Sequence, residues 1–281
     1  MILILDYGMG NSFSIKNMLY RVGLDSLISN NIDEINKAEK IIMPGVGAFD
    51  AAIENIEKLG IRKILYKKAK IEKIPILGIN AGRLGFLTSI KKDTLEEGLD
   101  LFFEGKYTNI KRSLLEVSTE KPVDTLEHFR YALNEVSINR KNTTSLLSID
   151  AKLDDQFLTT YWADGLIIAT PTGSPGYSLS SGGPIVSPSS ECLIVNPIAP
   201  HNINMRPLIV PDKTIFEVSV KGRGKNYLLS LDSRILTIEN GNDIFIKKAK
   251  FNAITVQLDG TFFFNTLREK LFWGHDSRNI Q

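Results

Sequence analysis

The sequence predicts an α/β N-terminal domain with a mainly parallel sheet, followed by an all-β domain of sandwich type. Residues 1–105 alternate short apolar runs with amphipathic helical patterns, which is typical of a parallel sheet covered by helices. From residue 106 to residue 281 the pattern changes to short strands separated by turn residues. The chain has 281 residues, of which 43% are hydrophobic, so it is long enough to bury a core in each of two domains.

In the first domain we predict strands at residues 1–6, 39–44 and 74–79, and helices at 12–23, 48–60 and 94–105. Thr94 and Glu97 have the spacing of a capping box at the start of the last helix, and Gly105 ends it. The strand at 74–79 is apolar and leads into a glycine-containing loop. Such loops lie at the sheet edge where open α/β folds bind ligands.

In the second domain the strand patterns fall at residues 112–119, 131–138, 144–153, 156–162, 165–170, 215–220, 226–233, 235–241, 243–249 and 254–260. The segments 154–155, 222–225 and 240–243 are rich in Asp, Gly and Asn, and we predict turns there.

Composition excludes several classes of protein. The formal net charge is +2 and basic residues are interspersed with acids, so we predict no nucleic-acid partner. No apolar run approaches the roughly 18 residues that span a bilayer, and the first residues are too short and uncharged for a signal peptide. The single cysteine, Cys192, fits a reducing compartment, so we expect a cytoplasmic protein. No His or Cys cluster has metal-ligand spacing.

The segment "DGLIIATPTGSPGYSLSSGGPI", residues 164–185, carries the most chemistry. An apolar strand runs into a loop rich in Gly, Ser, Thr and Pro, where Ser174 can cap a short helix that begins at Pro175. Backbone N–H groups at a helix start suit phosphate or ribose oxygens. Tyr177 offers a ring to stack on a base, and Asp164 offers a carboxylate to a sugar hydroxyl or an amide. A turn-rich connector with a capped helix explains the same composition.

Five motifs in order extend this interpretation: "PILGINAGRLGFL", "ALNEV", the 164–185 segment, "IAPHNINMRPLIVP" and "SLDSR". From about residue 74 to residue 281 the chain resembles the NAD kinases. The resemblance implies transfer of a phosphoryl group from ATP, or polyphosphate in some relatives, to the 2′-hydroxyl of NAD with Mg²⁺. It also implies a homodimer or homotetramer formed through the β-domain.

Residue by residue, the resemblance implies that Asn134 and Glu135 contact the ribose and base of the dinucleotide. Asp164 would engage the nicotinamide end or its ribose. The other residues implied in the NAD pocket are Phe86, Gly176, Tyr177, Ser178, Ser180, Ala199, His201 and Arg234. Pro175 stands where the family usually has Thr, which removes a hydroxyl and a backbone donor.

The family's "GGDG" loop, whose Asp handles the 2′-hydroxyl proton, has no counterpart in this sequence. "PGVG" at residues 44–47 takes its place. Phosphoryl transfer depends on such positioning, so the sequence predicts impaired kinase activity. Asp50 is the nearest carboxylate, although an acidic residue in a first helical turn also suits the helix dipole.

Residues 1–73 resemble the glutamine amidotransferase subunit of imidazole glycerol phosphate synthase, through "MILILDYGMGNSFSIKNMLYRVG" and "AEKIIMPGVGAFDAAIENI". In that family "PGVG" shapes the oxyanion hole, and a strand like "PILGI" leads to a nucleophilic Cys. Here Asn80 takes the position of that Cys, and an amide cannot form a thioester, so we predict no glutaminase activity. The sequence thus predicts a chimera in which residues 74–105 complete the first domain and 106–281 form a β-rich NAD-binding domain.

Three functions follow. The first is an NAD kinase of impaired activity, with NAD and ATP as ligands. The second is a non-catalytic NAD(P)-binding module, which would bind dinucleotide without product. The third is an inactive amidotransferase-like subunit that docks onto a cyclase, and the rest of its docking lobe is missing.

Overall fold

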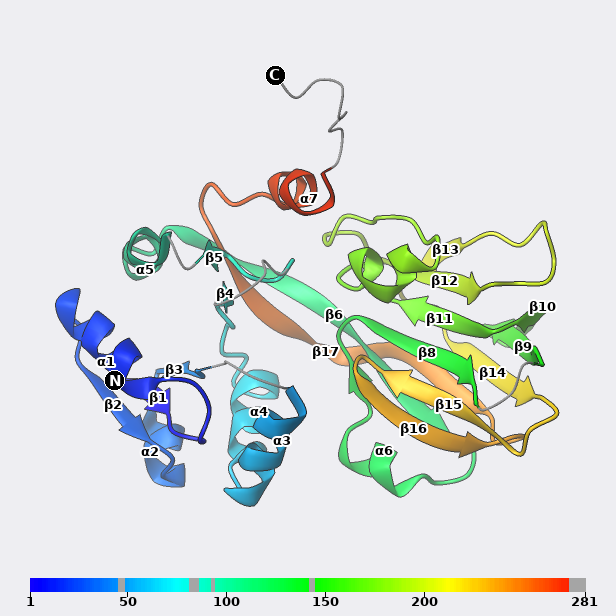
Figure 1. The fold of residues 1–281 in the computed structure, drawn as a ribbon, viewed down its shortest axis with the longest axis horizontal. Coiled ribbons are helices and arrows are strands. Elements are labelled where there is room, and N and C mark those ends of the chain that lie inside the picture. Colours follow the sequence, from blue (N-terminus) through cyan, green and yellow to red (C-terminus); the bar gives the residue numbers. More distant parts are fainter. Residues whose placement is uncertain (45–48, 81–85, 92–93, 142–144, 273–281) are drawn as a thin grey trace. The chain divides into compact units, whose positions relative to one another are not determined.

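The computed structural model describes residues 1–44, 49–80, 86–91, 94–141 and 145–272. The chain divides into two compact units, one of residues 1–110 and 253–281 and the other of residues 111–252. Two long strands, β6 (Tyr107–Thr119) and β17 (Ile244–Leu258), each contribute residues to both units (Figure 1). The predicted sequence boundary between residues 105 and 106 stays a prediction.

A three-stranded parallel sheet organises the start of the first unit. Its order is β2-β1-β3, formed by Ser26–Ser29, Ile2–Leu5 and Lys40–Ile42. Because side chains alternate along a strand, β1 packs two cores: Ile2 and Ile4 with Leu19 on one face, and Leu3 and Leu5 with other helices on the opposite face. The helices of this region are α1 (Ser12–Arg21), α2 (Ile32–Lys37), α3 (Phe49–Lys58) and α4 (Arg62–Lys70).

The predicted strand at 74–79 is much shorter than expected. Ile76 makes an isolated parallel bridge with Thr255, and only β4 (Ile79–Asn80) pairs as a strand, with β5 (Ile90–Lys91). Within the described residues this pair is a separate sheet from β2-β1-β3. The first unit therefore has two small parallel sheets.

Two further helices belong to the first unit, α5 (Leu95–Phe103) and α7 (Phe263–Leu271). The predicted capping box is wrong, because Thr94 lies at the N-cap with φ −113° and ψ 29° and makes no side-chain cap bond. The predicted end of α5 is confirmed: Gly105 has φ +77°, a conformation that glycine adopts without steric cost.

The second unit is an antiparallel sandwich, so the predicted fold class is confirmed. One six-stranded sheet has the order β10-β9-β14-β17-β6-β7, and the other has the order β13-β12-β11-β8-β15-β16. The remaining strands are β7 (Tyr131–Ala132), β8 (Glu135–Arg140), β9 (Leu147–Leu153), β10 (Gln156–Ala163), β11 (Gly165–Ala169), β12 (Cys192–Ile198), β13 (Leu208–Pro211), β14 (Phe216–Lys221), β15 (Asn226–Leu231) and β16 (Arg234–Glu239); α6 (Asp124–His128) joins β6 to β7.

The core of the sandwich comes from alternate residues of both sheets. Val136 and Ile138 of β8 and Leu166 and Ile168 of β11 are buried in it, together with Phe216 from the facing sheet. Alternation turns the intervening residues of β8 and β11 away from this core. That outer face is where the candidate site lies.

Turn predictions in the second unit are confirmed where backbone angles identify them. Asp154 and Asp155 have φ +49° and +64° between β9 and β10, and Gly241 has φ +77° between β16 and β17. The predicted strands at 243–249 and 254–260 form one continuous strand, β17. Among the described residues, the search for a helix long and apolar enough to cross a membrane finds none.

Candidate functional site

A strip of polar side chains follows the outer face of β8. Glu135, Ser137 and Asn139 alternate with the buried Val136 and Ile138, and Asn139 Nδ2 donates to Ser137 Oγ at 2.9 Å. The neighbouring strands β11 and β12 are covered on this same face, where Ile167, Ala169 and Ile194 pack against Val186. The strip therefore lies beside the covering segment 170–186.

The covering segment contains a short helical stretch, η2 (Ser174–Ser178), with a proline at its start as predicted and a kink at Gly176, where φ is −92° and ψ is −130°. The predicted cap is wrong. Ser174 is fully buried, its hydroxyl donates to the Pro171 carbonyl at 2.9 Å, and it accepts from the Val186 N–H at 3.0 Å. These bonds tie the two ends of the segment together, so this hydroxyl faces inward rather than toward a ligand. Gly182, with φ +81°, follows the helix.

Tyr177 connects this helix to the polar strip. Its ring is 41% exposed, and its hydroxyl donates to Asn139 Oδ1 at 3.4 Å. Ser180 is exposed on the same segment. Ser178, in contrast, is fully buried, and its hydroxyl accepts from Asn196 Nδ2 at 3.4 Å. Tyr177 and Ser180 thus present side chains to the surface, while Ser178 supports the helix from beneath.

The Glu135 carboxyl lies next to Gly176. A Cβ placed on Gly176 would be 3.5 Å from Glu135 Oε2, so the glycine leaves space above the carboxyl. Among the described groups, this buried oxygen has no hydrogen-bond partner. Burial, with a further contribution from the charge of Asp232, raises the pKa of Glu135 to about 7. A buried oxygen of this kind is an acceptor that a bound hydroxyl or amine would satisfy.

Asp164 precedes β11, at the strand end opposite to Ala169 and the covering loop. Its carboxylate pairs with Arg140, with Oδ1 at 3.3 Å from Nε, and the Arg140 N–H donates to the Asp164 carbonyl at 3.0 Å. Gly165, the next residue, pairs with Asn139 across the two strands. Asp164 is therefore close to the Asn139 end of the strip, and Glu135 is at the other end.

The remaining predicted residues are spread more widely. Ala199 and His201 are exposed just after β12, and the His201 N–H donates to the Trp162 carbonyl at 2.7 Å. Phe86 belongs to the first unit, where Lys270 Nζ lies 4.8 Å from its ring centroid. Asp50 is the second residue of α3, and its side chain is outside the described residues, as are residues 45–47 of the "PGVG" loop.

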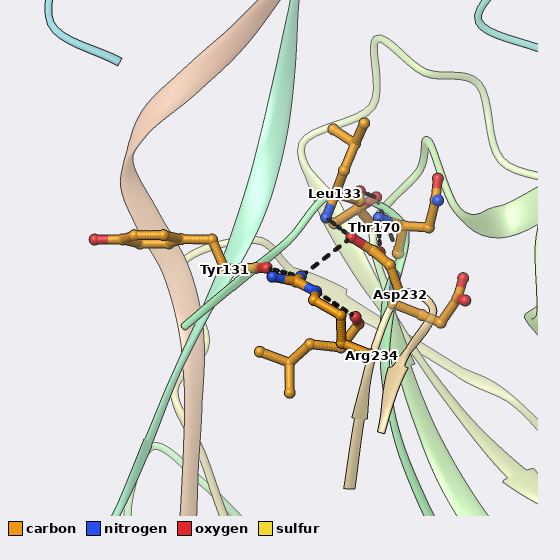
Figure 2. A network of polar contacts seen from close by, with 8 residues as sticks. Tyr131, Leu133, Thr170, Asp232 and Arg234 are labelled. Carbon is orange, nitrogen blue, oxygen red and sulfur yellow. Dashed lines mark hydrogen bonds and ion pairs between the residues drawn. The ribbon is translucent and has the colours of Figure 1, made fainter. Parts of the chain in front are cut away.

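Asp232 is a residue that the sequence interpretation missed. Its carboxylate accepts three consecutive backbone N–H groups: Leu133 at 2.9 Å on Oδ2, and Asn134 and Glu135 at 2.7 and 3.2 Å on Oδ1 (Figure 2). The predicted residue Arg234 lies in the same network, with Nη2 at 3.8 Å from Asp232 Oδ2 and bonded to the Tyr131 carbonyl. The motif "SLDSR" marked Asp232 as an acidic residue in a tight turn but gave no sign of its contact with residues 133–135.

The described residues contain no group of three or more His, Cys, Asp and Glu side chains that could hold a metal ion. Mg²⁺ binds through one or two carboxylates together with nucleotide phosphates and water.

The chain has the two-part organisation of a nucleotide-dependent kinase. The model of the ATP-NAD kinase C-terminal domain matches residues 133–258, which include the polar strip, and the model of the ATP-NAD kinase N-terminal domain matches residues 61–107. The NAD kinase of Christiangramia forsetii is 52% identical over 206 residues, covering 73% of this chain and 70% of its own length. The NAD kinase of Flavobacterium johnsoniae is 41% identical over 249 residues, covering 88% and 85%. The chain therefore belongs to the NAD kinase family.

Solved structures confirm the fold. Yeast NADH kinase complexed with NADH superposes with a TM-score of 0.74 at 19% identity, covering 100% of this chain and 90% of that chain. The NAD kinase of Archaeoglobus fulgidus in complex with ATP gives a TM-score of 0.68 at 24% identity, covering 95% and 98%. The α/β part and the antiparallel sandwich are both features of this fold.

The raised pKa of Glu135 predicts a pH-dependent stability. The folded state holds the Glu135 proton up to about pH 7, while the unfolded state releases it near pH 4.5, so this group's contribution to stability is lost as pH rises between those values. We expect Glu135→Gln to raise the Tm at pH 8 by roughly 2–4 °C, the shift that about 1 kcal/mol gives in a domain of this size. At pH 5 the Tm should change little.

Calorimetric melting at both pH values measures this difference. Glu239→Gln, which removes an exposed carboxylate from β16, is the matched control. Equal effects of Glu135→Gln at pH 5 and pH 8 would contradict the assignment of a buried, protonated carboxyl.

Proposed function

We propose that the chain binds NAD along the outer face of β8 and transfers the γ-phosphoryl group of ATP to its adenosine 2′-hydroxyl, at a reduced rate. The observation that carries the binding part is the buried Glu135 Oε2, which lacks a partner and lies beside the open space at Gly176. A polar ligand that donates to this oxygen removes the cost of leaving it unsatisfied. Membership of the NAD kinase family supports a dinucleotide as that ligand.

In this proposal the polar strip sets the orientation of the dinucleotide. Glu135 and Asn134 accept from the hydroxyls of one ribose, and Tyr177 offers the face of its ring to a base. Asp164 is held by Arg140 near the other end of the strip and accepts from the nicotinamide end. Ser180, Ala199 and His201, all exposed, and Arg234 complete the proposed pocket as border residues, and Ser178 supports it from below. The role that the family resemblance implies for Phe86, which belongs to the first unit, stays a prediction.

ATP enters the proposal as the phosphoryl donor together with Mg²⁺, which neutralises charge on the phosphates when bound to them. This chain's own residues bind and orient the acceptor. No residue is assigned as a metal ligand in this proposal.

The reduced rate follows from the sequence at residues 44–47. "PGVG" carries no carboxylate at the position where the family's "GGDG" Asp would handle the acceptor proton. Asp50 is the nearest carboxylate in the sequence, and we keep it as the candidate for residual proton transfer. General-base catalysis contributes about 10²–10⁴-fold, so the loss of a positioned base would leave slow turnover rather than none.

An assay of NADP formation tests the missing base. With ATP, Mg²⁺ and NAD, we expect Val46→Asp to raise kcat by at least about tenfold, because it restores a carboxylate in the motif. Val46→Asn is the matched control without a base. Wild-type turnover at about 10 s⁻¹, a typical enzyme rate, would refute the proposed impairment.

A non-catalytic NAD(P)-binding module is the second candidate function, and the absence of "GGDG" favours it. It predicts the same dinucleotide binding without NADP formation. Calorimetric titration separates binding from turnover and also tests the assigned pocket.

We expect Tyr177→Ala to weaken NAD binding about tenfold, since base stacking on an aromatic ring contributes roughly 1–3 kcal/mol. Asp164→Ala should weaken it by a similar factor, because a hydrogen bond to a charged group contributes about 1.5–3 kcal/mol. Ser190→Ala, at an exposed residue away from the strip, should bind as wild type does. Unchanged NAD affinity in both Tyr177→Ala and Asp164→Ala would refute the assignment of the NAD pocket to the outer face of β8.

We also propose that residues 1–73 are of different origin, as their amidotransferase-like motifs suggest. The NAD kinase family match begins at residue 61 and overlaps the last part of this segment, so it does not support a junction near residues 70–76. The support for a different origin is limited to the motifs at residues 1–23 and 38–56. An inactive subunit that docks onto a cyclase would be retained by an immobilised cyclase of that family, and a purely NAD kinase-like chain would pass through.

Self-association is the last part of the proposal. β10 and β13 each form one edge of a sheet, and they expose large apolar side chains, which favours burial against another copy. These side chains are Phe157, Leu158, Trp162, Leu208 and Ile209.

We expect Trp162→Glu to convert a wild-type dimer or tetramer into smaller species, because it places a charge on the apolar edge. Light scattering after gel filtration measures the mass. Phe13→Glu, at an exposed aromatic residue of the first unit, is the control. A wild-type monomer at micromolar concentration would contradict the proposal.

A further inference from the structure

The peptide that carries Asn134 and Glu135 is held from two sides. On one side the Asp232 carboxylate accepts the N–H groups of residues 133, 134 and 135, and the Asp232 N–H donates to the Glu135 carbonyl at 3.0 Å. On the other side Thr170 Oγ1 donates to the Leu133 carbonyl at 2.6 Å, and the Thr170 N–H donates to the Asn134 carbonyl at 2.8 Å (Figure 2). The backbone of these three residues therefore has little freedom.

Asp232 is not the residue type that backbone preference alone favours at its position in the turn. Asp232 is the first residue of the two-residue connection between β15 and β16 and has φ +52°, where glycine is favoured. Glycine would satisfy the turn but could not accept the three N–H groups. An aspartate at this position is explained by its side chain rather than by its backbone.

Arg234 and Thr170 extend the network in both directions. Arg234 Nε donates to the Leu231 carbonyl at 3.2 Å, and its guanidinium lies 3.6 Å from the centroid of the Phe129 ring, which fixes the far side of the turn. Thr170 Oγ1 also accepts from the Gly173 N–H at 3.2 Å, just before η2. The position of Asp232 is thus linked through Thr170 to the helix that carries Gly176 and Tyr177.

We propose that Asp232 is a positioning residue for dinucleotide binding: its carboxylate fixes the backbone of residues 133–135 and thereby holds the Glu135 carboxyl beside Gly176. The inference rests on the proposed binding of NAD along β8. Asp232 acts through the backbone and need not touch the ligand.

The same carboxylate acts on the charge of Glu135. Burial is the larger cause of the raised Glu135 pKa and the negative charge of Asp232 is the second, so removal of that charge should lower the pKa while leaving it above its ordinary value. Arg234, 3.8 Å from Asp232 Oδ2, is the cation of this network. A purely structural turn residue would not shift the ionisation of Glu135.

Asp232→Asn is the central variant, because it keeps the shape and the tolerance of φ > 0 but removes the charge and one acceptor. Asp232→Gly favours the turn and removes the side chain altogether. It therefore separates the effect of the clamp, the contact of the Asp232 carboxylate with the N–H groups of residues 133–135, from the effect on hairpin formation. Ser233→Ala, at the exposed neighbour in the same turn, is the matched control.

Three measurements are made on the full-length chain. Hydrogen exchange of the amides of residues 133–135 should be at least about tenfold faster in Asp232→Asn, because the charged acceptor that holds these amides is lost. The Glu135 titration midpoint, followed by carboxyl-carbon NMR, should move to lower pH. The Kd for NAD, measured by calorimetry, should rise by about tenfold. Ser233→Ala should match the wild type in all three.

Unchanged exchange at residues 133–135 in folded Asp232→Asn would overturn the proposal, as would an unchanged Glu135 midpoint or an NAD affinity within twofold of wild type. If Asp232→Gly fails to fold, the measurements on Asp232→Asn alone test the positioning role of Asp232. If the wild-type chain does not bind NAD, the proposed function fails, and the exchange rates and the Glu135 midpoint then decide on the clamp.

Discussion

The alternation of β8 between the two sides of its sheet is the constraint on which the site depends. Val136 and Ile138 are 0% exposed in the sandwich core, and this burial forces Glu135, Ser137 and Asn139 onto the opposite face. A shift of one residue in the pairing of β8 with β11 or β15 would place Glu135 in the core and two apolar residues on the surface. The hydrophobic core thus fixes the register, and the register fixes the polar strip.

Burial of Glu135, the first residue of the strip, creates a second requirement, because the residue must be held in place while the space above its carboxyl stays open. Asp232 and Thr170 hold the backbone of residues 133–135, whereas Glu135 Oε2, next to Gly176, has no hydrogen-bond partner among the described groups. Buried polar atoms are almost always paired, so the unpaired Glu135 carboxyl oxygen is a candidate contact for a ligand. The stability of the surrounding sandwich offsets the free energy that burial of this unpaired oxygen costs.

The fold could be predicted from sequence because its signals are local: strand–helix alternation in the first part, and short strands with Asp and Gly turns in the second. The site was only partly predictable. Asn134, Glu135 and Tyr177 were found through motifs, but Asp232 acts on residue 134 across 98 positions, and no local pattern encodes that contact. Thr94 and Ser174 were assigned as caps from spacing and residue type. Both assignments failed, Thr94 because its side chain makes no cap bond and Ser174 because tertiary contacts took its hydroxyl.

In the proposed function, binding and chemistry are assigned to different parts of the chain. The strip, η2 and the Asp232 turn are all formed within residues 111–252, whereas residues 44–47, where the resemblance places the family's catalytic Asp, belong to the other unit. The backbone bonds between Glu135 and Asp232 are made within residues 111–252. Phosphoryl transfer depends strongly on positioning and charge stabilisation, so the proposed acceptor site would keep its contribution to positioning even without a base at residues 44–47.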